Sequence, residues 1–102
     1  MVVIVDLAIV PMGSGVSVSK FVAEAKKELE RRKVKHHLTP MSTVYEAASV
    51  GEAFEIAKAA HEAVFKAGVS RLVTILRIDD RRDAERKGME EKVKAVEKAL
   101  GD

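Results

Sequence analysis

The sequence predicts an α+β domain of ferredoxin-like topology, in which a four-stranded antiparallel sheet is covered on one face by two helices. Segments typical of strands and helices follow one another in the order βαββαβ, and one further C-terminal helix comes last. Two interleaved βαβ units with right-handed crossovers around a central hairpin produce such a sheet. The length of 102 residues suits a single domain over residues 1–102, which buries roughly two-thirds of the surface of its unfolded chain.

The first strand and the first helix follow from the spacing of apolar residues. Residues 2–10 are β-branched and apolar except for one aspartate, and proline and glycine then end the strand. Ser17 or Ser19 can cap the helix that follows. Apolar residues recur on this helix every three or four positions, so we expect Phe21 and Leu29 to lie in the core.

The middle of the sequence predicts a hairpin and a second helix. Residues 34–41 and 43–50 have strand character and meet near Pro40, which lacks a backbone donor and suits a turn. Residues 51–67 carry apolar side chains at helical spacing. We expect Gly68 to stop this helix in the left-handed conformation.

The last third of the sequence predicts one strand and one helix. Residues 70–78 alternate in polarity and are rich in Leu, Val, Thr and Ile, as in a strand. Residues 79–83 are too charged to continue a buried strand. A helix is expected from about Ala84, because apolar residues between Met89 and Leu100 are spaced by three or four.

The first strand is apolar on both of its faces. One face carries Val3, Val5, Leu7 and Ile9, and the other carries Val2, Ile4, Ala8 and Val10. A half-exposed antiparallel strand would instead alternate apolar and polar residues. The sheet face that the helices leave free can be covered by the last helix of the same chain or by another copy. We expect another copy, and hence a dimer or a tetramer.

The composition argues against several classes of protein. There are no cysteines, so thiolate catalysis and cysteine-ligated metal sites are excluded, and we expect neither a metal nor a cofactor. The net charge of +2 is spread over interleaved basic and acidic residues, which does not favour nucleic acid as a partner. Without an apolar run of membrane-spanning length or a basic leader, a cytoplasmic protein is expected. The lack of Asn and Gln beside abundant Lys, Arg and Glu is typical of a thermophilic source.

No motif supports catalysis, and the polar residues of the strands have structural alternatives. No nucleophile, base and orienting acid stand in a known arrangement, so we expect no enzyme. His36 and His37 point to opposite faces of their strand and do not bind one metal together. Asp6 is a charge in an apolar strand and needs a partner. That partner is either a cationic or amino-bearing ligand or a structural one, namely Arg77, Lys35 or a residue of another subunit.

Residues 38–46, LTPMSTVYE, resemble the signature of the thiamine-binding, YkoF-like family of small ferredoxin-like proteins. The resemblance covers essentially the whole chain. It implies a dimer or tetramer that binds thiamine or its hydroxymethylpyrimidine part without transforming it. Thr43 and Glu46 match the family pattern, whereas Ser42 and Ala47 stand where glycines are common.

The resemblance implies a ligand site on the central hairpin. Glu46 is the expected principal contact, because a carboxylate can accept hydrogen bonds from an aminopyrimidine. Thr43 lies three residues away and converges with it only if the strand bulges or turns. The full set of candidate ligand-binding residues is Glu46, Thr43, Tyr45, Ser42, Asp6 and His37. The alternative function is a regulatory or structural oligomeric module whose assembly is tuned by a small anionic metabolite.

Overall fold

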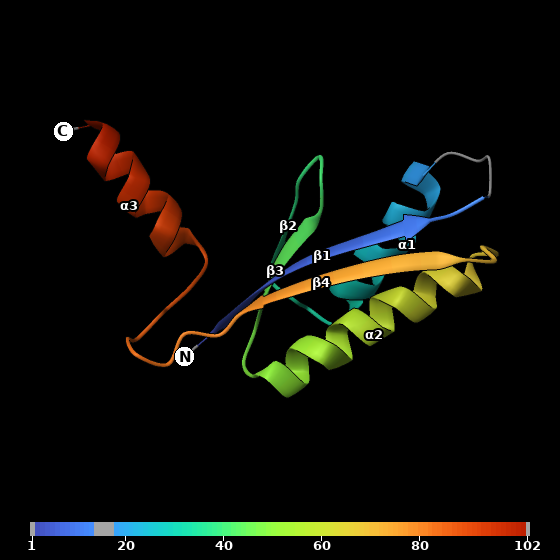
Figure 1. Ribbon diagram of the computed structural model, residues 1–102, viewed down its shortest axis with the longest axis horizontal. Helices are drawn as coiled ribbons and strands as arrows, with labels where there is room; N and C mark the ends of the chain where they lie inside the picture. The colour runs from blue at the N-terminus through green and yellow to red at the C-terminus, as the bar shows by residue number, and fades with distance from the viewer. Residues whose placement is uncertain (1, 14–17, 102) are drawn as a thin grey trace.

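The computed structural model describes residues 2–13 and 18–101. Its helices and strands follow the predicted order (Figure 1). They are β1 (Val3–Pro11), α1 (Val18–Arg31), β2 (His36–Leu38), β3 (Thr43–Ala47), α2 (Val50–Lys66), β4 (Leu72–Asp79) and α3 (Glu90–Gly101). The strands form one four-stranded antiparallel sheet in the order β2-β3-β1-β4. The predicted α+β fold with its extra C-terminal helix is therefore confirmed.

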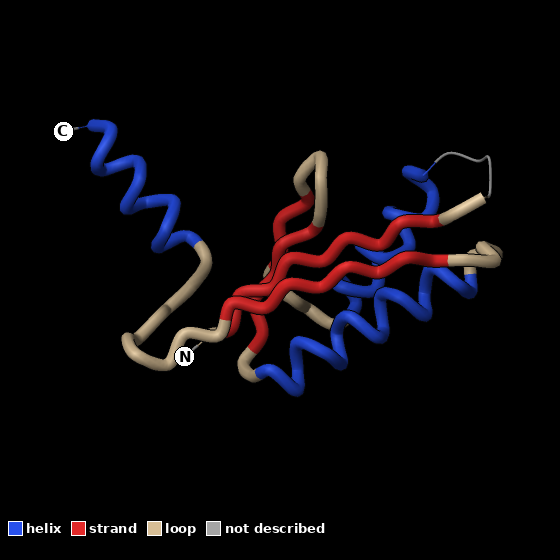
Figure 2. Tube along the Cα trace, in the orientation of Figure 1, coloured by secondary structure: helices blue, strands red, loops and turns tan. Residues whose placement is uncertain are grey.

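Helices α1 and α2 cover one face of the sheet, and the opposite face is open (Figures 1 and 2). Both helices pack on β1 and on each other. Helix α3 lies apart from them, beyond the end of the sheet at which β4 stops (Figure 1). The alternative in which α3 folds back over the open face of its own chain is therefore not adopted.

The core between the sheet and the two helices is apolar. Its largest fully buried side chains are Tyr45, Leu29, Val5 and Val64. Phe21 is buried beside Val64 in an adjoining cluster. The prediction that Phe21 and Leu29 of α1 lie in the core is confirmed. The two faces of β1 differ in burial. Val3, Val5 and Leu7 point toward the helices and are buried, whereas the residues between them point to the open face.

Helix α2 begins with a reciprocal cap. Ser49 has an extended backbone, and its hydroxyl oxygen accepts a hydrogen bond from the Glu52 amide at 3.1 Å. The Glu52 carboxylate in turn accepts one from the Ala48 amide at 3.1 Å. These bonds satisfy backbone donors at the start of α2 that have no partner within the helix.

The substitution Ser49→Ala should therefore lower the free energy of unfolding by about 1 kcal/mol, because it removes the acceptor at the helix start. Urea denaturation of the variant measures the change. The exposed Ser70 offers a matched control, and Ser70→Ala should change the stability by less than about 0.5 kcal/mol. Equal effects of the two substitutions would show that the cap does not stabilise α2.

The predicted hairpin strands are too long. Strands β2 and β3 are shorter than the expected strands over 34–41 and 43–50. Thr39 and Pro40 leave the ladder to form the turn, since proline cannot donate to it. Ser49 leaves it to cap α2.

The predicted start of α3 near Ala84 is wrong, because the helix begins at Glu90. The charged residues before it pair over short distances instead. Arg81 contacts Asp83 at 2.7 Å. Arg82 contacts Asp80 at the same distance. Residues two positions apart do not face each other on a helix, so these pairs suit an irregular segment.

The predictions for two helix ends have different outcomes. Gly68 has a φ of +106° directly after the last turn of α2, as expected of a residue that stops a helix. Ser19 lies inside α1 and is not its cap. Ser17, the other expected cap, lies outside the described residues.

Candidate functional site

The sheet separates the candidate ligand-binding residues into two groups. The strand register places Asp6, His37 and Glu46 on the open face. Thr43 and Tyr45 alternate with Glu46 along β3 and lie on the face that the helices cover. The strand has no bulge that would bring the two groups together, because its pairing with β1 runs without interruption over this segment.

Tyr45 is a core residue. Its side chain is 0% exposed, and its hydroxyl donates a hydrogen bond to the Ala53 carbonyl of α2 at 2.7 Å. Burial raises the pKa of this hydroxyl above its ordinary value. Tyr45 therefore connects β3 to α2 and does not share a surface with Glu46.

Glu46 holds the start of α3 against β3. Its carboxylate accepts a hydrogen bond from the Met89 amide at 2.8 Å and lies 3.3 Å from the Lys35 ammonium. Lys35 also contacts Glu90 at the first position of α3. The negative charge of Glu90, and to a smaller extent that of Glu46, raises the pKa of Lys35 above its ordinary value. No local pattern signals this anchor, because Glu46 and Met89 are far apart along the chain.

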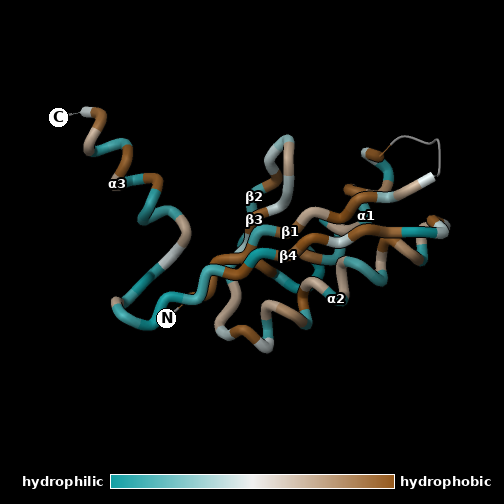
Figure 3. Tube along the Cα trace, in the orientation of Figure 1, coloured by the Kyte–Doolittle hydropathy of each residue, from teal (hydrophilic) through white to brown (hydrophobic). Residues whose placement is uncertain are grey.

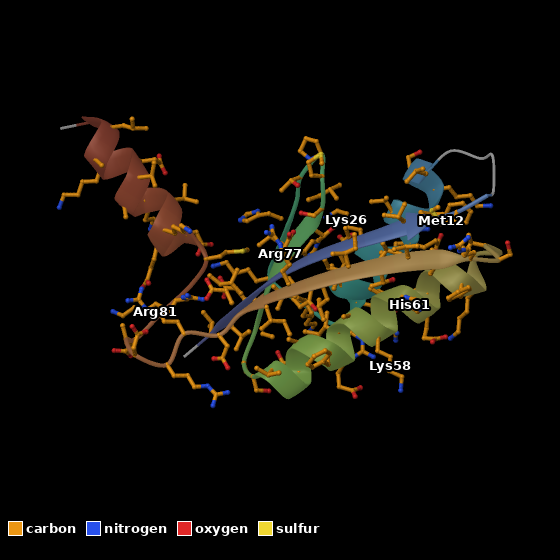
Figure 4. The ribbon with its side chains drawn as sticks, in the orientation of Figure 1. Met12, Lys26, Lys58, His61, Arg77 and Arg81 are labelled. Atoms are coloured by element: carbon orange, nitrogen blue, oxygen red, sulfur yellow. The ribbon has the colours of Figure 1, made fainter. Side chains whose placement is uncertain are left out.

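Asp6 pairs with Arg77 across β1 and β4 (Figure 4 labels Arg77 on the sheet). The Arg77 guanidinium donates to Oδ2 of Asp6 from Nε at 3.0 Å and from Nη2 at 2.7 Å. The pKa of Asp6 lies below its ordinary value, chiefly because of the nearby Ser42 hydroxyl and secondly because of Arg77. Burial acts in the opposite direction. The cationic partner that the sequence allowed for Asp6 is thus Arg77.

The substitution Asp6→Asn should lower stability at neutral pH by about 0.5–1 kcal/mol, the range of a partly exposed ion pair. Because the folded pKa lies below the ordinary value of 3.8, ionised Asp6 stabilises the fold above that value. The contribution is lost as the pH falls through the folded pKa. Urea denaturation of both proteins over a pH series should show the gap closing in acid, and a gap independent of pH would contradict this assignment.

The turn of the hairpin is held by Thr39. Its amide donates to the Ser42 carbonyl at 2.8 Å, and its hydroxyl donates to the same oxygen at 2.9 Å. The same hydroxyl oxygen accepts bonds from the amides of Met41 at 3.2 Å and Ser42 at 3.0 Å. Pro40 has no backbone N–H, so its place in the turn leaves no donor without a partner.

A cavity of about 190 Å³ lies between this hairpin, β1 and α1. It is lined by residues 7–10 of β1, by Val18, Val22, Ala25 and Leu29 of α1, and by residues 38–43 of the hairpin. Hydroxyl groups come from Thr39, Ser42 and Thr43, and no lining residue is ionisable. The Thr39 hydroxyl already has partners within the turn. Within residues 2–13 and 18–101, the Thr43 hydroxyl makes no hydrogen bond to the protein.

The walls that α1 contributes were not identified as site residues from the sequence. Val18, Val22 and Ala25 lie on the apolar stripe of α1 and therefore have the spacing of ordinary core residues. Their spacing contains no signal that distinguishes a cavity wall from a filled core. The hairpin residues Ser42 and Thr43, by contrast, were among the candidates.

His36 and His61 have local structural contacts. The Nδ1 of His36 donates a hydrogen bond to the Val34 carbonyl at 2.7 Å, and its Nε2 accepts one from the Lys26 ammonium at 2.9 Å. His61 on α2 contacts Thr74 at 2.6 Å (Figure 4). Among residues 2–13 and 18–101, no three His, Cys, Asp or Glu side chains are grouped as a metal site would require. Within the same ranges, no helix has both the length and the apolar character needed to cross a membrane.

Comparison with known proteins agrees with this fold. The chain is 47% identical to a UPF0045 protein of Staphylococcus xylosus, over 97% of this chain and 95% of that protein. It is 42% identical to a UPF0045 protein of Methanothermobacter thermautotrophicus, over 93% of this chain and 96% of the other. The solved structure of a hypothetical protein from Methanocaldococcus jannaschii superposes with a TM-score of 0.82 at 35% identity, covering 94% and 96% of the two chains.

A fourth comparison concerns a more distant structure. A Thermotoga maritima protein, proposed by its name to act in thiamine biosynthesis or salvage, has the same fold with a TM-score of 0.79 at 21% identity. The match covers 94% of this chain and 99% of that one. Residues 5–97 match the family model described as "Thiamine-binding protein". The relatives from Staphylococcus xylosus and Methanothermobacter thermautotrophicus are both UPF0045 proteins, and the chain therefore belongs to the thiamine-binding protein family.

Proposed function

We propose that this protein binds thiamine or a related hydroxymethylpyrimidine without transforming it. The observation that carries the proposal is the cavity beside the hairpin, because the segment with the family-like sequence forms one of its walls. Membership of the thiamine-binding family supports the ligand class. The name of the Thermotoga maritima neighbour points in the same direction.

The size and lining of the cavity suit one small ring. A cavity of roughly 150 Å³ accommodates benzene, and this one has about 190 Å³. Apolar side chains of β1 and α1 can pack on the two sides of a pyrimidine. The Thr43 hydroxyl can donate to a ring nitrogen or accept from the exocyclic amine. A neutral aminopyrimidine fits this lining better than a cation does, since no lining carboxylate is present.

The same lining supports binding without catalysis. General acid–base chemistry needs a titratable side chain within hydrogen-bond reach of the reacting group. The residues that line the cavity supply hydroxyl groups but no histidine, carboxylate or lysine. Asp6 does not line the cavity, and its charge is paired with Arg77 on the open face of the sheet.

Titration calorimetry with thiamine and with hydroxymethylpyrimidine tests the proposal. The wild type should bind at least one compound, and hydroxymethylpyrimidine should suffice. Thr43→Val, which keeps the shape but removes the hydroxyl, should weaken binding about 2- to 10-fold. If the wild type binds neither compound, the proposed function is wrong.

Glu46→Gln is the matched comparison, because it lies on the other sheet face and keeps an acceptor for the Met89 amide. It should leave the affinity unchanged within about twofold if the ligand occupies the cavity. If Glu46→Gln abolishes binding and Thr43→Val leaves it unchanged, the ligand is correct but its site lies on the open face of the sheet.

A further inference from the structure

The mouth of the cavity beside the hairpin carries an exposed methionine. Met41 lies at the tip of the hairpin and lines the cavity, yet it is 86% exposed. A residue that belongs to the wall and is open to solvent lies at the rim of a cavity and not at its floor. Val10, Val18 and Leu38 line the same cavity and are also exposed, so the rim is apolar. The wall that β1 adds is apolar as well (Figure 3).

The backbone of Met41 is held in place, whereas its side chain is free to move. The Met41 amide donates to the Thr39 hydroxyl oxygen at 3.2 Å, within the turn that Thr39 also closes on Ser42. The methionine side chain has three rotatable bonds and a polarisable sulfur that makes favourable contacts with aromatic rings. Because Met41 is so exposed, its side chain gives up little packing when it moves. It can therefore fold over a ring in the cavity from a fixed point of attachment.

Met41 also presents the sulfur that is most open to an oxidant among residues 2–13 and 18–101. Met12 is 37% exposed and Met89 only 7%. The chain has no cysteine, so no thiol of its own competes for a peroxide. Hydrogen peroxide transfers one oxygen atom to a thioether: the S–O bond forms, the O–O bond breaks and water leaves. The sulfur is oxidised and the peroxide is reduced. The sulfoxide that forms is polar, and sulfoxide reductases convert it back to the thioether.

We propose that Met41 is a movable cover of the ligand cavity, and that its oxidation to the sulfoxide by a hydroperoxide lowers the affinity for the ligand. This inference rests on the proposed function and adds regulation to the same site. The thioether covers a bound pyrimidine, so that apolar surface of both groups leaves water. The sulfoxide brings a polar oxygen to a rim on which the side chains of Val10, Val18 and Leu38 offer no hydrogen-bond donor. Oxidation therefore favours the uncovered cavity.

Titration calorimetry with hydroxymethylpyrimidine and with thiamine, before and after peroxide treatment, tests the regulation. Catalase removes the peroxide before each titration, and peptide mass spectrometry should find the added oxygen at Met41 first. The oxidised wild type should bind about 3- to 10-fold more weakly than the untreated protein, because the sulfoxide no longer covers the ring.

Two leucine variants are the matched controls. Met41→Leu keeps an apolar cover of similar volume but takes up no oxygen, so its affinity should stay within about twofold of the untreated wild type before and after treatment. Met12→Leu should remain as sensitive to peroxide as the wild type, because Met12 does not line the cavity. An equal loss of binding in treated Met41→Leu would overturn the proposal and leave the proposed function standing.

Protection by the ligand measures the cover directly. Saturating hydroxymethylpyrimidine should slow the oxidation of Met41 at least about threefold, since the covering sulfur is shielded from the oxidant. The oxidation rate of Met12 should not change. Equal rates at Met41 with and without the compound would show that Met41 does not cover the cavity. An untreated wild type that binds neither hydroxymethylpyrimidine nor thiamine would overturn the proposed function and this inference with it.

Discussion

Leu29→Ala should lower the free energy of unfolding by about 2–5 kcal/mol, the range for a large apolar side chain removed from a core. Leu29 is 1% exposed and lies in the main core cluster with Val5 and Tyr45. It also borders the cavity beside the hairpin. The space that the substitution opens joins this cavity, so the surrounding side chains cannot close it without moving α1.

Urea denaturation with a two-state fit gives the change for Leu29→Ala. Leu100→Ala is the matched control, since Leu100 is 81% exposed and should change the stability of the isolated chain by less than about 0.5 kcal/mol. The comparison is made at a protein concentration below that of any self-association, so that only the fold is measured. A loss below about 0.5 kcal/mol for Leu29→Ala would place Leu29 outside the core.

The fold was predictable because its signals are local. The alternation along β1, the helical spacing from Phe21 to Leu29 and the left-handed Gly68 each depend on residues that are neighbours in the sequence. Errors arose where two local signals compete. Residues 48–50 have strand character, but Ser49 offers a better end to β3 by capping α2.

The candidate site was only partly predictable because it depends on the sheet. The sequence selected Thr43 and Glu46 from one hairpin, but their spacing places them on opposite faces of β3. Which face holds a cavity depends on how α1 packs, and this packing has no signature in the spacing of Val22 and Ala25. The pairing of Glu46 with Met89 joins segments that are far apart in the sequence.

Glu46→Ala should release the start of α3 from the sheet. The carboxylate that binds the Met89 amide at 2.8 Å is lost, and a hydrogen bond to a charged group contributes about 1.5–3 kcal/mol. Hydrogen exchange at the Met89 amide should therefore become about 10- to 150-fold faster, since the release is local and need not unfold the core. Glu46→Gln is the control, because the amide oxygen still accepts this bond.

The two roles considered for Glu46 predict opposite results for this variant. As the anchor of α3, Glu46 controls hydrogen exchange at the Met89 amide, and its replacement changes the affinity for hydroxymethylpyrimidine little. If Glu46 is instead the principal ligand contact, Glu46→Ala should weaken hydroxymethylpyrimidine binding by about 1.5–3 kcal/mol, and the Met89 amide should remain protected from exchange. Measuring exchange and ligand titration on the same sample separates these roles, because only the anchor role predicts faster hydrogen exchange at the Met89 amide, whose acceptor is the Glu46 carboxylate.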